Sequence, residues 1–134
     1  MSKPTNVGRW RRSLVLHVCT SCRGAGESRD YPPGTKLFAE LRDAFREHPN
    51  AASVEVRPAE CLSVCPRPCG IALSSPGSWT YLFGDQRPAV TVQDIVDCVA
   101  LYARSIDGHM SRDQRPKSLR TSILGRIPAI RRAD

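Results

Sequence analysis

The stretch Glu60-Cys61-Leu62-Ser63-Val64-Cys65-Pro66-Arg67-Pro68-Cys69-Gly70 decides the fold predicted for this sequence of 134 residues. A second cysteine group, Cys19-Thr20-Ser21-Cys22, lies upstream of it. Each group closely follows an apolar run typical of a strand, so we expect both on loops at strand ends. Four thiolates on two such loops are what a zinc ion or an iron–sulfur cluster requires. The pattern therefore predicts a metal site that joins the two loops.

Strand and helix patterns surround these cysteines. Residues 13–18 resemble a buried strand that runs directly into Cys19, and residues 53–57 alternate like a half-buried strand. Between them, apolar residues at helical spacing predict a helix over about 35–48, capped by Thr35.

A hairpin and a second helix complete the predicted fold. Residues 70–74 and 79–83 are expected to form the hairpin, and the helix should run from Thr91 to about residue 105. The order β-α-β-β-β-α predicts a two-layer α/β domain of the thioredoxin-like type. Its first two strands should be parallel, with a right-handed crossover, in a four-stranded mixed sheet.

The positive charge lies outside this core. The net charge is +7, yet residues 13–103 carry eight basic and ten acidic groups, and residues 104–134 carry eight basic and three. We therefore expect a basic N-terminal extension over 1–12, a thioredoxin-like domain over 13–108 and a basic C-terminal arm over 109–134. Such an arm can bind an anionic partner, although nucleic acid is not expected because no aromatic residues lie among its arginines.

The arm carries one short apolar group, formed by Ile123, Leu124 and Ile127. Their spacing suits a single helical turn ended by Pro128. We expect these residues to dock on the domain or on a second copy of the chain, which would make a homodimer.

The sequence also indicates where the protein resides. We find neither a signal peptide nor an apolar run of about 18 residues, so we expect a cytoplasmic protein without a membrane span. Cytosolic thiols stay reduced, and clustered cysteines there bind metal more often than they form disulfides.

Several alternatives remain open on this evidence. Zinc would fix the fold without redox chemistry. A dithiol oxidoreductase could use Cys19 and Cys22, but an irregular loop follows them instead of the helix N-terminus that would lower a thiol pKa. Cys69 repeats the spacing between Cys61 and Cys65, so it is an alternate ligand, whereas Cys98 fits a small core residue. No catalytic constellation is found, and we do not expect an enzyme.

Over about residues 13–105, the chain resembles the thioredoxin-like [2Fe–2S] ferredoxins. The resemblance rests on the order of strand, cysteine group, helix and strand, followed by Cys61-Leu62-Ser63-Val64-Cys65. The same arrangement occurs in the ferredoxin-like subunit of respiratory NADH dehydrogenases. This resemblance implies a [2Fe–2S] cluster held by Cys19, Cys22, Cys61 and Cys65, and an electron carrier or redox sensor that meets a redox partner protein. The spacing of Cys19 and Cys22 is shorter than is usual in that family.

More of the chain looks like a bacterial family of small, predicted metal-binding proteins without an established activity. The residues that carry this resemblance are Cys61-Leu62-Ser63-Val64-Cys65-Pro66-Arg67-Pro68-Cys69, Trp79-Thr80-Tyr81-Leu82-Phe83-Gly84-Asp85, Arg115-Pro116 and Arg126-Ile127-Pro128.

Overall fold

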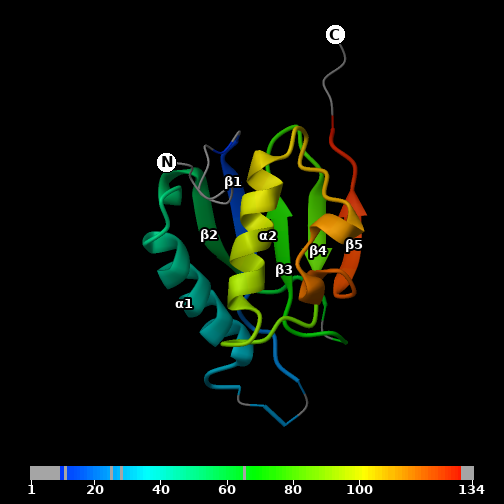
Figure 1. Cartoon of the computed structure of the whole chain (residues 1–134). Coiled ribbons are helices and arrows are strands. Elements are labelled where there is room, and N and C mark those ends of the chain that lie inside the picture. Colours follow the sequence, from blue (N-terminus) through cyan, green and yellow to red (C-terminus); the bar gives the residue numbers. More distant parts are fainter. Residues whose placement is uncertain (1–9, 11, 25, 28, 65, 131–134) are drawn as a thin grey trace.

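The computed structural model describes residue 10 and residues 12–24, 26–27, 29–64 and 66–130. One five-stranded sheet has the order β2-β1-β3-β4-β5, and two α-helices lie on one of its faces (Figure 1). The α/β class and the predicted β-α-β-β-β-α order are confirmed, with one strand added at the C-terminal side. The strands are β1 (Leu14–Cys19), β2 (Val54–Ala59), β3 (Ile71–Ser74), β4 (Thr80–Phe83) and β5 (Ile123–Ile127), and the helices are α1 (Pro33–Arg46) and α2 (Val92–Arg104).

The sheet register brings the two cysteine groups to one edge. β1 and β2 are parallel, and their last residues, Cys19 and Ala59, are paired. β1 also pairs antiparallel with β3, and β3 with β4. Because parallel strands end at the same edge of a sheet, the loops that carry Cys19 and Cys61 leave the sheet side by side.

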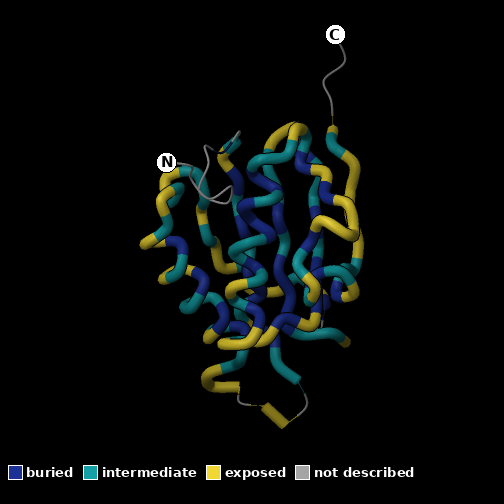
Figure 2. The backbone as a smooth tube through the Cα atoms, in the orientation of Figure 1, coloured by how far each residue is buried: buried dark blue, intermediate teal, exposed yellow. Residues whose placement is uncertain are grey.

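The core lies between the sheet and the helices, and Figure 2 shows the buried segments through the middle of the molecule. Every second residue of β1 is buried, as period-2 alternation requires. The predicted apolar stripes of α1 and α2 supply the opposite layer. The fully buried side chains at this interface include Leu16, Leu37, Leu41, Tyr81, Phe83, Ile95 and Tyr102.

The start of α1 differs from the prediction. The helix begins at Pro33, two residues before the expected cap Thr35, because the fixed φ of proline suits the first helical turn. The Thr35 hydroxyl instead donates a 2.9 Å hydrogen bond to the Thr20 carbonyl. The first turn of α1 is thereby attached to the first cysteine loop.

The C-terminal segment is folded against the domain. The helical turn expected over residues 123–127 is wrong: these residues form β5, which pairs antiparallel with β4. Two 3₁₀ turns, η3 (Arg112–Gln114) and η4 (Lys117–Leu119), precede β5. Met110 and Leu119 are fully buried. The open hydrogen-bonding edge of β4 explains the strand, since β5 satisfies those backbone groups.

Part of the N-terminal extension is also in contact with the domain. Trp10 is buried, and the Arg12 guanidinium donates hydrogen bonds to the carbonyls of Tyr102, at 2.7 Å, and Ile106, at 2.5 Å. Arg12 therefore satisfies carbonyl groups at the C-terminal end of α2. None of the helices in the described part is long and apolar enough to cross a membrane.

Candidate metal centre

Hydrogen bonds join the two cysteine loops where they leave the sheet. The Thr20 amide donates to the Ala59 carbonyl at 2.9 Å, and the Ser21 hydroxyl donates to the Glu60 carbonyl at 2.5 Å. The Leu62 amide then donates to the sulfur of Cys19 at 3.4 Å. The loop that carries Cys61 therefore lies directly against the first cysteine.

Among the cysteines of the group that the structure describes, Cys61 is the exposed one. Its sulfur accepts a 3.2 Å hydrogen bond from the Ser63 amide. Backbone N–H groups aimed at sulfur stabilise a thiolate, whether free or bound to metal. Two of the predicted ligands, Cys19 and Cys61, therefore already accept this type of hydrogen bond.

Cys22 and Cys69 meet below this surface. Both are buried, and the Cys69 thiol lies 4.0 Å from the Cys22 carbonyl oxygen. Burial raises the pKa of Cys22 to about 12, with hydrogen bonding to Cys19 as the next cause. Burial also raises the pKa of Cys69 to about 11, with added repulsion from Glu27 and Cys19. Both groups are thus neutral thiols near neutral pH in the protein alone, and a bound cation would be needed to favour their thiolates.

Helix α1 supports the first loop through Gly34, a residue that the sequence analysis did not identify. The Gly34 amide donates to the Cys22 carbonyl at 3.0 Å. A Cβ atom at this position would lie 2.1 Å from the Cys19 carbonyl oxygen and 3.0 Å from the Cys22 nitrogen. Only glycine allows this approach. The sequence signal was the run Pro32-Pro33-Gly34, which resembles a loop when read locally.

The second loop is attached to the β4–α2 connection. The backbones of Cys69 and Gln86 exchange two hydrogen bonds of 3.1 Å. The Arg67 guanidinium pairs with Asp85 and donates to the Thr121 carbonyl at 3.2 Å, just before β5. The position of the cysteine loop therefore depends on residues far away in the sequence.

The predicted site residues have different outcomes. Cys19, Cys22 and the alternate ligand Cys69 lie near one another, Cys61 lies on the adjoining loop, and Cys65 lies outside the described residues. Within the described ranges, no group of three or more histidine, cysteine, aspartate or glutamate residues has the geometry of a metal site. The donor set still fits, because its sulfur chemistry is that of zinc and iron–sulfur sites.

Cys98 is separate from this group, as predicted. It is buried in α2, and its thiol lies 3.7 Å from the sulfur of Met110.

Comparison with known proteins assigns the chain to a family. The model of the family described as protein of unknown function (DUF1636) matches residues 16–129. The chain belongs to this family. No curated protein matches it.

Two solved structures share the fold of this DUF1636 member. One is a thioredoxin-like [2Fe–2S] ferredoxin from Aquifex aeolicus, with 17% identity and a TM-score of 0.50, covering 63% of this chain and 77% of that one. The other is a cysteine-to-serine variant of the thioredoxin-like ferredoxin from the same organism, with 13% identity and a TM-score of 0.53, covering 84% of this chain and 98% of that one. The thioredoxin-like fold is thereby confirmed.

Proposed function

We propose that this protein is a small metal-binding protein, a [2Fe–2S] ferredoxin-like electron carrier or redox sensor, and not an enzyme. The observation that carries this proposal is the meeting of Cys19, Cys22 and Cys69 with the Cys61 loop at one edge of the sheet. A [2Fe–2S] cluster requires four terminal thiolates, two on each iron. The solved structures that share the fold are named as [2Fe–2S] ferredoxins, which supports the same chemistry.

Cys19, Cys22 and Cys61 are the proposed ligands, with Cys65 as the fourth and Cys69 as its alternate. When bound, such a cluster supplies one-electron transfer. The contact of Cys69 with the Cys22 carbonyl supports the alternate ligand.

Backbone hydrogen bonds and burial determine the environment of these sulfurs. The amides of Leu62 and Ser63 donate to the sulfurs of Cys19 and Cys61, and such bonds stabilise the reduced, more negative state. Burial of Cys22 and Cys69 keeps water from one side of the site. Exposed Cys61 lies on the other side, where we propose that a redox partner protein docks.

A dithiol oxidoreductase is less well supported. It needs a cysteine whose pKa is lowered into the neutral range. A helix that opens at the C-x-x-C motif lowers a thiol pKa in this way, but α1 begins only at Pro33, well after Cys19 and Cys22.

Anaerobic purification of the full chain tests the proposal. A [2Fe–2S] protein gives visible absorption and about two irons and two sulfides per chain. A colourless protein with about one zinc per chain would overturn the redox role in favour of a zinc-stabilised interaction module. A colourless protein with neither metal would overturn metal binding altogether.

Single serine variants test the ligands. Cys61→Ser should lose iron, whereas Cys98→Ser, in the core of α2, should retain it. Comparison of Cys65→Ser with Cys69→Ser identifies the fourth ligand as the variant with the larger loss. Equal iron loss in Cys61→Ser and Cys98→Ser would contradict the ligand assignment, provided that circular dichroism shows both folded.

A further inference from the structure

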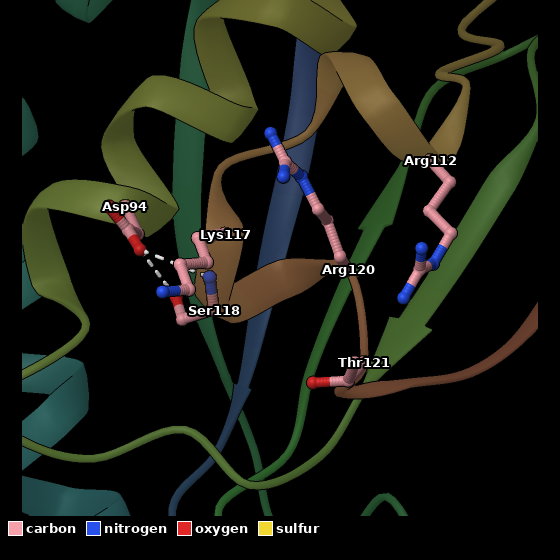
Figure 3. Close-up of a pocket in the computed structure, with 6 residues that line it drawn as sticks. All are labelled: Asp94, Arg112, Lys117, Ser118, Arg120 and Thr121. Carbon is pink, nitrogen blue, oxygen red and sulfur yellow. Dashed lines mark hydrogen bonds between the residues drawn. The ribbon is translucent and has the colours of Figure 1, made fainter.

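A pocket of about 540 Å³ lies between the first turn of α2 and the turns η3 and η4, and none of the described cysteines lines it. Figure 3 shows its lining, which comes from α2 and from the segment before β5. The lining residues are Asp94, Arg112, Lys117, Ser118, Arg120 and Thr121. The volume is within the range of small-ligand sites. Most of the residues belong to the basic C-terminal segment, whose charge the proposed metal chemistry does not use.

The charge of this pocket is not balanced by the protein. In the part of the chain that the structure describes, neither Arg112 nor Lys117 forms a side-chain hydrogen bond or an ion pair. Asp94, the acid among the described lining residues, accepts hydrogen bonds from the Ser118 hydroxyl at 2.6 Å and from the Ser118 amide at 3.4 Å (Figure 3). Arg112 and Lys117 therefore line the same pocket with charges that a bound anion would neutralise.

The turns that carry these groups are held firmly. The buried Arg115 guanidinium donates to the carbonyls of Leu119, at 2.9 Å, and Met110, at 3.1 Å. Arg120 donates to the Arg115 carbonyl at 2.9 Å and to the Asp113 carbonyl at 3.3 Å. The backbone around the pocket is thus fixed before any ligand arrives, which lowers the entropic cost of binding.

We infer that this pocket binds small phosphate-bearing anions, of which pyrophosphate is the simplest probe. Guanidinium groups such as that of Arg112 match phosphate oxygens in a bidentate fashion, and Lys117 adds a point charge. Thr121 also lines the pocket, and its hydroxyl can donate a hydrogen bond. The lining residues that the structure describes include no aromatic residue, so the pocket recognises phosphate groups and not a stacked nucleobase.

Calorimetric titration of the full chain with pyrophosphate tests this inference at about 100 mM salt. We expect saturable binding at one site. The Arg112→Gln, Lys117→Gln double variant should bind at least about tenfold more weakly, since two charged donors are lost. A matched control, Lys36→Gln with Arg46→Gln, removes the same charge from exposed positions of α1 and should change the affinity less than about twofold.

Three outcomes would overturn the inference. The first is the absence of saturable pyrophosphate binding, and the second is equal weakening in the double variant and its control, which would indicate an unspecific charge effect. The third is equal affinity for citrate, a carboxylate anion, which would remove the preference for phosphate. The side chains of Arg112 and Lys117 hold no described contact, so the double variant should fold, and circular dichroism checks this.

Discussion

Replacement of Gly34 by alanine should displace the first cysteine loop from helix α1. The added Cβ would lie 2.1 Å from the Cys19 carbonyl oxygen and 3.0 Å from the Thr20 carbonyl carbon, whereas ordinary contacts begin near 3.4 Å. The opposing atoms belong to the backbone, so no side chain can rotate to make room. The helix or the loop must move by more than an ångström.

The free energy of this change can be estimated. Overpacking costs about 1–3 kcal/mol, and an overlap with backbone belongs at the upper limit. Alanine improves the helix by up to about 1 kcal/mol, so the net loss in the free energy of unfolding is about 2 kcal/mol. At a urea m-value of about 2 kcal/mol/M, the unfolding midpoint should fall by about 1 M.

Urea unfolding with metal analysis measures both consequences of the Gly34→Ala variant. The midpoint should fall, and metal content should fall with it, because Cys19 and Cys22 lie on the displaced loop. Gly125→Ala in β5 is the matched control, since nothing lies within 4 Å of its added Cβ. A Gly34→Ala protein with the midpoint and metal content of the Gly125→Ala protein would refute this account of the helix–loop contact.

Three further results are expected. Burial raises the pKa of Cys98 from 9.0 to about 12, so its contribution to stability is complete below pH 9 and is lost as the pH rises towards 12. In urea titrations between pH 9 and 12, the free energy of unfolding should therefore fall less steeply with pH in Cys98→Ala, by up to about 1.4 kcal/mol per pH unit. An unchanged pH dependence would contradict this. Deletion of residues 109–134 removes the buried side chains of Met110 and Leu119, whose burial contributes about 3–6 kcal/mol to the free energy of unfolding. Cooperative thermal unfolding should therefore be lost. A melting temperature equal to that of the full chain would show that the segment is dispensable. The Tyr81 hydroxyl accepts a 2.7 Å hydrogen bond from the Met110 amide. Tyr81→Phe leaves that amide without its partner and should lower the free energy of unfolding, measured in urea, by about 1–3 kcal/mol. An unchanged free energy would show that water replaces the hydroxyl.

The sequence predicted those parts of the fold that depend on local periodicity. The apolar run over residues 13–18 predicted a buried strand, and the apolar stripe near Leu37 and Leu41 predicted a helix. Both patterns are visible locally because burial selects apolar residue types. Parallel pairing of the first two strands followed from the intervening helix. These inferences were enough to bring the loops of Cys19 and Cys61 to one edge.

The tertiary structure decided the features that depend on residues distant in the chain. Ile123–Ile127 form a strand because the edge of β4 has backbone groups that need hydrogen-bond partners. The local sequence of 123–127 carries no information about that edge. Gly34 must be glycine because Cys19 passes against it, fifteen residues earlier in the chain. The charges of Arg112 and Lys117 were visible as a basic segment, but only folding around Asp94 gathers them about one pocket. Composition determines which charges and thiols a chain carries, whereas packing determines which of them meet.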